Sequence, residues 1–476
     1  MKYKRKWLLL VSVIVLVGLL FVLFWRFKAK VGLVFPIDLY PLSLQGHQRL
    51  LVLAPHCDDE TLGAGGVIQA ALQAGMQVRV VIATNGDGFL FATLEEFRRL
   101  YPRHQDFIRM GNLRQQESLS ALKVLGVSAE QVTFLGYPDR GTPALWDNNW
   151  SNKYPYRSVY SGLDRSPYPV TYDTNAVYAG EDFLADLLSI LRSYQPDFIL
   201  YPHPDDLHPD HWGLSAFTRL AVILYQHESP RYRPDTYAYL VHRPDFPIPK
   251  GLKPGASLLP PPMLFDLDPN WYRFDLSQEE ITLKGEAVKQ YKSQLPLLHG
   301  LLDSFIRTDE PFDQPQAAQL ADLSSGDPHN PDTWRGASGE IIPPVQLDPV
   351  GDFFTRKLAP AADLIALYIA RQADGSLLIC SEMQNHVRPT LVYTLRIKAI
   401  GSNGIIDYAA RNRSLHPGWK LALLAGKYVC AQVSLADLGN PWLVFAGANS
   451  EEAGMAILDQ IAWQAIYVAP AVQTGQ

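Results

Sequence analysis

The chain has 476 residues, of which 47% are hydrophobic and 19% are charged, and this composition excludes a disordered, collagenous or coiled-coil protein. Its length predicts two or three domains. The formal net charge is −6, although the first 30 residues are basic, so the remaining chain is more acidic than the whole. An acidic body lacks the positive field that holds phosphate backbones, which excludes nucleic acid as the expected partner. Three cysteines without a Cys-x-x-Cys pair exclude a disulfide framework and a zinc ribbon.

The N-terminal 30 residues have the pattern of a membrane anchor. Residues 7–25 are uncharged and rich in Leu, Val, Ile and Phe. As a helix rising about 1.5 Å per residue, they would span about 30 Å of hydrocarbon. Basic residues follow directly, with no small-residue cleavage site, which favours an uncleaved anchor over a signal peptide. More basic residues precede the segment than follow it, so we expect a single-pass membrane protein whose body lies outside the cytoplasm.

The next part of the chain alternates between strand and helix patterns. Residues 31–47 contain two prolines and few charges and predict a short tether. Between residues 48 and 201, fully apolar runs alternate with helical periodicity that ends at glycines. The expected strands cover residues 49–54, 77–83, 131–135 and 197–201, and the expected helices lie near residues 67–72, 113–125 and 184–191. Strands that are apolar throughout predict a parallel sheet with helices on both faces, hence a Rossmann-like α/β domain.

A segment rich in aromatic residues interrupts this alternation at residues 141–178. Its tryptophans and tyrosines stand among Asn, Asp and Ser. Two interpretations remain open, because long ordered loops often carry function while aromatic side chains are often simply buried. The segment is either a packed surface insertion or a lid whose rings stack on sugar rings.

The C-terminal part has a different character. Residues 313–350 are rich in Pro, Asp, Gly and Ser and predict a linker. From residue 351 to residue 476, short alternating runs separated by turns such as Asp374-Gly375 predict a smaller all-β, sandwich-like domain. Such a domain either packs on the preceding one or binds carbohydrate. The sequence does not decide whether Cys380 and Cys430 pair.

Two clusters of histidine and acidic residues carry the chemistry. Pro55-His56-Cys57-Asp58-Asp59-Glu60 follows the first predicted strand, and His208-Pro209-Asp210-His211 follows the strand that ends at Tyr201. In an open parallel sheet, ligands bind at the carboxyl ends of the strands, so the two clusters are expected to meet there. Two imidazoles and one carboxylate are the ligand set of many catalytic zinc sites. The competing interpretation is a pair of solvated loops in which acids cap helices.

These motifs resemble the PIG-L/LmbE-like family of zinc-dependent N-deacetylases. Beyond the two clusters, the resemblance extends over shorter motifs to about residues 48–312 and leaves out the N-terminal segment and the β region. The additional motifs are Thr61-Leu62-Gly63-Ala64-Gly65-Gly66, Arg114-Gln115-Gln116-Glu117, Leu135-Gly136-Tyr137-Pro138-Asp139 and, more weakly, Tyr291-Lys292-Ser293-Gln294 and residues 307–312.

The resemblance also implies roles for individual residues. His56, Asp59 and His211 are expected to bind Zn²⁺, with Fe²⁺ as the alternative metal. Asp58 is expected to be the general base, a role that the sequence alone could equally give to Glu60, and His208 to stabilise the oxyanion. Three further residues match positions near substrate, or fit an extension of the second motif, and have structural roles as the alternative: Arg114, Asp139 and Asp206. Asp210 is expected to assist catalysis by orienting one of the histidines.

The predicted function is therefore removal of the N-acetyl group from an N-acetylated amino sugar, in a glycolipid or a cell-surface polysaccharide. One alternative is a zinc amidase acting on a non-sugar or thiol-conjugate amide, since the same site chemistry would serve it. The other is a non-catalytic glycan-binding surface protein in which the β region binds. Substrate identity and oligomeric state do not follow from these residues.

Overall fold

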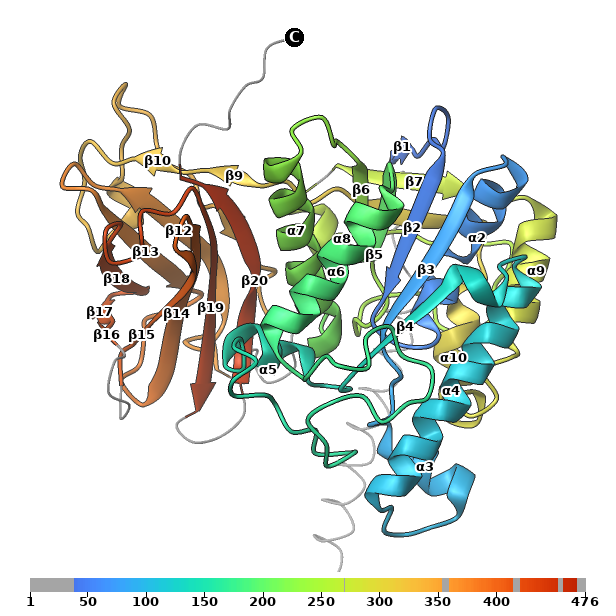
Figure 1. Ribbon diagram of the computed structural model, residues 1–476. Coiled ribbons are helices and arrows are strands. Elements are labelled where there is room, and N and C mark those ends of the chain that lie inside the picture. Colours follow the sequence, from blue (N-terminus) through green and yellow to red (C-terminus); the bar gives the residue numbers. More distant parts are fainter. Residues whose placement is uncertain (1–37, 269, 353–358, 414–419, 453–456, 469–476) are drawn as a thin grey trace, which may run out of the picture.

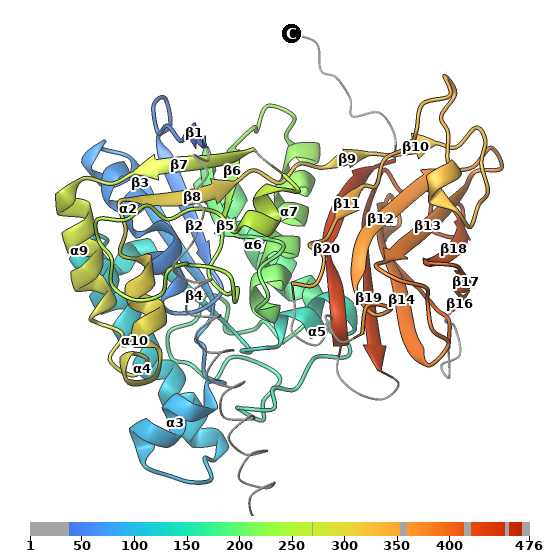
Figure 2. The same ribbon diagram turned by 180° about the vertical axis from the view of Figure 1, so that it is seen from behind.

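The computed structural model describes residues 38–268, 270–352, 359–413, 420–452 and 457–468. It places them in an α/β part built on one eight-stranded sheet and a β-rich part built on two six-stranded sheets, as Figure 1 and, from behind, Figure 2 show. The α/β part carries both histidine clusters, and the β-rich part packs on the helices of one of its faces (Figure 1).

The eight-stranded sheet is mixed rather than wholly parallel, which corrects the expected fold class. Its order is β1-β7-β8-β6-β5-β2-β3-β4. Strands β2 to β6 pair in parallel, as predicted, but β8 runs antiparallel to β6 and β7. The sequence of β8, Asp-Glu-Pro-Phe-Asp, contains no apolar run, so periodicity does not reveal it. The strands are β1 (Tyr40–Pro41), β2 (Arg49–Ala54), β3 (Gln77–Thr84), β4 (Val132–Tyr137), β5 (Phe198–Pro202), β6 (Asp235–Tyr239), β7 (Trp271–Asp275) and β8 (Asp309–Asp313).

Helices cover both faces of this sheet because alternate residues of its strands enter two different cores. Leu50 and Val52 of β2 join a core with the helices on one face, while Leu51 and Leu53 join the core on the other. The first face carries α2 (Asp59–Gln73), α4 (His104–Val124), α9 (Gln278–Val288) and α10 (Leu295–Leu302). The second carries α5 (Thr142–Asp147), α6 (Gly180–Tyr194) and α7 (Pro209–Glu228). Two short helices, α3 (Leu90–Phe97) and α8 (Pro262–Phe265), lie in connecting segments.

Part of the aromatic segment is packed against the protein. Trp146 is fully buried, and its ring meets those of Phe217 and Trp463 edge to face. Tyr168 is buried and donates a hydrogen bond to Asp87. These contacts support the interpretation of a packed insertion for this part of the segment.

The β-rich part consists of two sheets that share one apolar core. Residues 313–350 contribute the short strands β9 (Ala318–Gln319), β10 (Ala321–Asp322) and β11 (Gln346–Leu347). Cys380 and Cys430 lie opposite each other on adjacent strands and form a disulfide. The remaining strands are β12 (Leu364–Arg371), β13 (Ser376–Met383), β14 (Leu391–Gly401), β15 (Gly404–Arg411), β16 (Lys420–Leu421), β17 (Leu423–Ala425), β18 (Tyr428–Ser434), β19 (Leu443–Glu452) and β20 (Ile457–Tyr467).

The β-rich part joins the α/β part mainly through β20 and α7. Phe445 and Trp463 enter the same apolar core as the helices α5 to α7. The buried guanidinium of Arg219 on α7 donates a hydrogen bond of 2.7 Å to the carbonyl of Trp463. An apolar contact with a buried polar anchor explains why the two parts lie against each other (Figure 2).

The predicted single-pass membrane localisation is corrected. Within the ranges given above, no helix is both long and apolar enough to cross a membrane. The helix α4, at 21 residues, carries charged side chains from Asp106 to Lys123. Residues 7–25, from which the span was predicted, lie outside the described residues, as do residues 31–37 of the expected tether.

Candidate metal centre

The two histidine clusters meet at the carboxyl ends of the neighbouring strands β2 and β5. His56 lies in the loop between β2 and α2, and Asp59 is the first residue of α2. His208 caps the N-terminus of α7, which places His211 in the first turn of that helix. The two helices therefore begin side by side, and their first residues point at the same small volume.

Three side chains form the centre of this cluster. The Oδ2 atom of Asp59 lies 3.0 Å from Nδ1 of His56 and 3.0 Å from Nε2 of His211. Ligand atoms held at about 2.1 Å by a tetrahedral metal are about 3.4 Å apart, so small shifts of these side chains would let them share a metal. Asp59 Oδ1 is buried and lacks a hydrogen-bond partner among the described residues. A buried, unsatisfied carboxylate oxygen beside two imidazoles fits a cation.

Two further carboxylates hold the outward-facing nitrogens of the histidines. Asp210 Oδ2 lies 3.1 Å from Nε2 of His56, and Asp206 Oδ2 lies 3.0 Å from Nδ1 of His211. Asp210 also accepts hydrogen bonds from the backbone N–H of Arg140 and Thr142. Each expected histidine ligand thus has its own orienting carboxylate, an arrangement common around protein-bound metals.

The carboxylates make the cluster strongly attractive to positive charge. Burial opposes protonation of His211, but Asp206 and Asp59 raise its pKa to about 9. Burial likewise opposes protonation of His56, and the neighbouring carboxylates of Asp139, Asp210 and Asp59 raise its pKa well above the ordinary value. The raised pKa values keep His56 and His211 protonated when no metal is bound. A metal that binds here would displace these protons.

Asp58 lies beside this cluster and is held by an arginine. Its Oδ2 atom lies 3.1 Å from Nη2 of Arg114, whose Nη1 donates a hydrogen bond of 2.8 Å to the carbonyl of Gly86. Burial raises the pKa of Asp58 to about 6, against the opposing charge of Arg114. At Gly86, φ is +60° and a Cβ atom would lie 1.9 Å from Nη1 of Arg114, so only glycine leaves room for the guanidinium.

Glu60, the other carboxylate that the sequence offered as a base, is occupied elsewhere. It is fully buried and accepts hydrogen bonds from Ser118, Tyr291 and the backbone N–H of Asp58. These bonds hold the loop that carries His56 and Asp58. The structure therefore gives Glu60 a scaffolding position, and of the two carboxylates considered as the base only Asp58 stays next to the cluster.

His208 and Asp139 lie on the side of His56 away from Asp59. The rings of His208 and His56 are 4.5 Å apart, and Asp139 Oδ1 lies 3.6 Å from Nε2 of His56. Nδ1 of His208 accepts a hydrogen bond from the backbone N–H of Asp210, which leaves Nε2 as its donor. Burial and the neighbouring histidines lower the pKa of His208 well below its ordinary value. A neutral His208 can therefore still donate through Nε2–H.

The structure adds His242, which no sequence motif indicated. It follows β6, and its Nε2 atom lies 3.7 Å from Oδ1 of Asp59. One ring nitrogen each of His242, His56 and His211 and a carboxylate oxygen of Asp59 all lie within 4.8 Å of one another. Burial and the charge of His211 lower its pKa to about 4. The only signal for it is its place after a strand, and β6 was not among the predicted strands.

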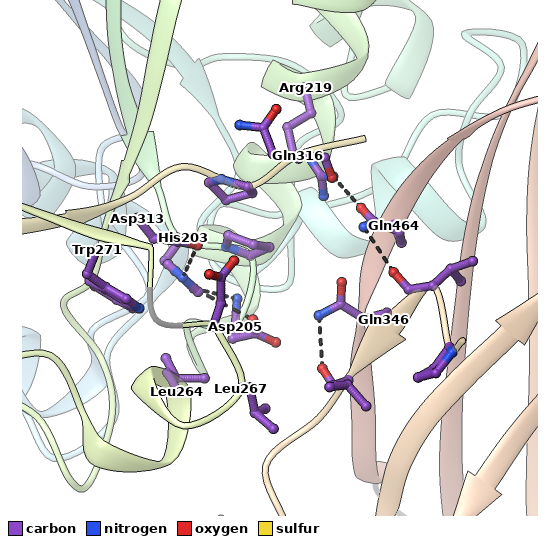
Figure 3. Close-up of a pocket in the computed structure, with 16 residues that line it drawn as sticks. His203, Asp205, Arg219, Leu264, Leu267, Trp271, Asp313, Gln316, Gln346 and Gln464 are labelled. Carbon is purple, nitrogen blue, oxygen red and sulfur yellow. Dashed lines mark hydrogen bonds and ion pairs between the residues drawn. The ribbon is translucent and has the colours of Figure 1, made fainter. Parts of the chain in front are cut away.

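His203 and Asp205 lie away from this centre. His203 donates through Nε2 to Asp313, and its ring stacks on Trp271. Both residues line a cavity of about 260 Å³ between the α/β part and the β-rich part, to which Gln346 and Gln464 contribute from the β-rich side. Figure 3 shows this cavity, in which His203 points toward Asp313. The loop before His208 thus turns His203 away from the cluster and Asp206 toward it.

Comparison with known proteins agrees with the resemblance seen in the motifs. Residues 51–222 match the PIG-L family model, described as GlcNAc-PI de-N-acetylase. The 1D-myo-inositol 2-acetamido-2-deoxy-alpha-D-glucopyranoside deacetylase of Mycobacterium sp. (strain KMS) is 32% identical over 196 residues, which are 40% of this chain and 56% of that protein. The protein of the same name from Corynebacterium urealyticum is 29% identical over 37% of this chain and 48% of its own length. The chain thus spans about half the length of the curated relatives it matches.

Among solved structures, the N,N'-diacetylchitobiose deacetylase from Pyrococcus horikoshii is similar over 60% of this chain and 88% of its own, with 18% identity and a TM-score of 0.36. A likeness at this level carries no argument about function. The family match begins in β2, ends in α7 and includes both histidine clusters. Residues 51–222 of this chain are therefore similar to a PIG-L family domain.

Proposed function

We propose that this protein is a metal-dependent hydrolase that removes the N-acetyl group from an N-acetylated amino sugar and releases acetate. One observation carries the proposal: a buried carboxylate with a raised pKa, Asp58, stands directly beside a cluster of imidazole and carboxylate donors. A general base works best when its pKa lies near the working pH. The family match over both clusters supports the same chemistry.

His56, Asp59 and His211 would hold the metal, Zn²⁺ or Fe²⁺. A metal at this position would polarise the acetyl carbonyl and make water more acidic. Asp210 and Asp206 would keep the two imidazoles facing inward through the contacts described above.

The protein's own groups would move the protons. Asp58 takes one proton from the attacking water as the water oxygen bonds to the acetyl carbon. His208 donates its Nε2–H toward the oxygen that gains negative charge. The C–N bond then breaks, and the departing nitrogen takes the proton held by Asp58. The products are acetate and a free amino sugar.

The three residues expected near substrate fall into different positions. Arg114 binds Asp58, and Asp206 lies behind His211, so both act by positioning other groups. Asp139 faces the cluster beside His56. Burial raises the pKa of the half-buried Tyr156, and the charges of the nearby Asp210 and Asp139 raise it further. We propose that Asp139 and Tyr156 contact the sugar, for which aromatic and carboxylate groups are suited.

The test is metal content together with acetate release by the purified full chain. The N-acetylated amino sugar linked to inositol, on which the curated relatives act by name, is the first substrate to assay, with N,N'-diacetylchitobiose as the second. We expect about one metal ion per chain, acetate formation, and loss of both after His211→Ala. A folded parent protein without bound metal would contradict the proposal. So would a metal-loaded protein that releases acetate from no N-acetylated sugar in the panel.

A further inference from the structure

His242 is the one imidazole of the cluster that lies outside both motifs. His56 and Asp59 belong to the first motif and His211 to the second, whereas His242 is carried by the segment after β6, in the sequence Tyr-Leu-Val-His-Arg-Pro. Its position near the metal donors therefore depends on a third piece of the chain. Because β6 is the neighbour of β5 in the sheet, the segment after β6 reaches the same sheet edge.

Asp206 fixes this third segment relative to His211. Its Oδ2 atom accepts the backbone N–H groups of Val241 and His242 at 3.0 and 2.9 Å, and the same atom lies 3.0 Å from Nδ1 of His211. The backbone N–H of Leu207 donates to the carbonyl of His242 at 3.1 Å, which adds a reciprocal bond. One carboxylate thus orients an expected metal ligand and, at the same time, the backbone that presents His242.

The side chain of His242 is available for a ligand. Its ring lies 4.6 Å from that of His211 and 5.2 Å from that of His208. Its Nε2 atom faces Asp59 Oδ1, the carboxylate oxygen without a hydrogen-bond partner, at 3.7 Å. Among the described residues, no hydrogen bond engages the nitrogens of its ring, so the geometry leaves its Nε2 lone pair directed at the donor cluster.

We propose that His242 is a fourth protein ligand of the metal, on the solvent side of the site. The inference rests on the proposed function, because it concerns the metal that function requires. The exposed fraction of its side chain is 29%, against 6% for His56 and 0% for Asp59 and His211. The most exposed ligand is the one that water and substrate reach first, so His242 is placed to leave the metal when substrate arrives. Zinc sites tolerate such a change between four and five ligands.

The chemistry of this arrangement differs from that of a three-ligand site. Four protein donors saturate a tetrahedral ion and hold it more tightly than three, while a catalytic site needs one open position. A labile His242 would reconcile tight retention of the metal with access for substrate. Loss of His242 should therefore weaken metal binding more than it weakens turnover of the metal-loaded protein.

The experiment compares metal affinity in the full-length parent, His242→Ala and a control. Zn²⁺ affinity is measured by competition with a chromophoric chelator, and the visible absorption of the Co²⁺-loaded protein reports the number and type of ligands. We expect His242→Ala to weaken Zn²⁺ binding by about 10-fold or more and to change the Co²⁺ spectrum. His227→Ala, which removes an exposed histidine stacked on Trp442, should change neither. If His242→Ala does not fold, His242→Gln takes its place, because glutamine keeps more of the side-chain volume.

The outcomes separate the inference from the proposed function. If the parent binds Zn²⁺ and releases acetate but both His242 variants keep the parent's affinity and Co²⁺ spectrum, the inference is overturned and the proposed function stands. If the folded parent binds neither Zn²⁺ nor Co²⁺, both the proposed function and the inference about His242 are contradicted. Weaker metal binding in both His242 variants, with unchanged thermal unfolding of the metal-free proteins, supports the fourth ligand.

Discussion

The α/β part and the β-rich part bury charge in opposite ways. In the α/β part, six charged or titratable side chains converge at one edge of the sheet, namely His56, Asp58, Asp59, Asp206, Asp210 and His211, and all of them are buried. In the β-rich part, the buried Lys398 forms an ion pair with Asp407 on the neighbouring strand, and that partner is half exposed. Burying many charges together is costly, so their convergence indicates a site, whereas a lone pair needs only a structural explanation.

The largest expected effect concerns the cluster of buried charges in the α/β part. Asp58→Asn keeps the side-chain shape but removes the base, so we expect kcat to fall by about 10²- to 10⁴-fold. Metal content should remain that of the parent, because Asp58 is outside the expected ligand set. Acetate release and metal analysis on the same preparation check this. Parent-like turnover by Asp58→Asn would show that another group is the base.

Arg114→Gln should have a smaller effect with a diagnostic pH dependence. Arg114 opposes the burial that raises the pKa of Asp58 to about 6. Removing its charge raises that pKa further, so Asp58 becomes ionised only at higher pH, and the acidic limb of the kcat/KM profile should move upward in pH. The profile is measured from pH 5 to 9. An unshifted limb with lower activity would mean that Arg114 only contacts substrate.

In the β-rich part, removal of the disulfide should affect stability and spare the site. Cys380 and Cys430 are 50 residues apart in the sequence, and closing a loop of this size contributes about 3 to 4 kcal/mol. Cys380→Ala combined with Cys430→Ala should lower the free energy of unfolding by about this amount, as measured by denaturant titration under oxidising conditions. The kcat of the folded variant should equal the parent's. A large loss of kcat would mean that the two parts are functionally coupled.

The smallest expected effect concerns a buried acid outside the cluster. Burial raises the pKa of Asp186 to about 7, although a hydrogen bond from Tyr137 opposes this rise. Between about pH 4 and 7 the folded state therefore binds more protons than the unfolded state, and this group makes stability decrease as pH rises through that range. Asp186→Asn should make the free energy of unfolding less dependent on pH between 5 and 8. An identical slope for parent and variant would contradict the assignment.

Predictability differed between the site's ligands and the groups that orient them. His56, Asp59 and His211 stand in short motifs after apolar strands, and the structure brings them together. The carboxylates that orient the histidines were not predictable in detail. Neither motif shows which ring nitrogen of His211 meets Asp206 or which ring nitrogen of His56 meets Asp210. His242 was missed altogether, because a single histidine after a strand of mixed polarity has no distinguishing pattern.

The sequence by itself determined the alternation of strands and helices, the two motifs and the sheet edge at which they meet. These features are local, because apolar runs select buried strands and the residues after a parallel strand lie at its carboxyl end. Only the tertiary structure decided the antiparallel position of β8, the disulfide, and the meeting of His242 with Asp59. Each of these depends on which strands become neighbours, and the energy that selects neighbours comes from packing between segments far apart in the sequence.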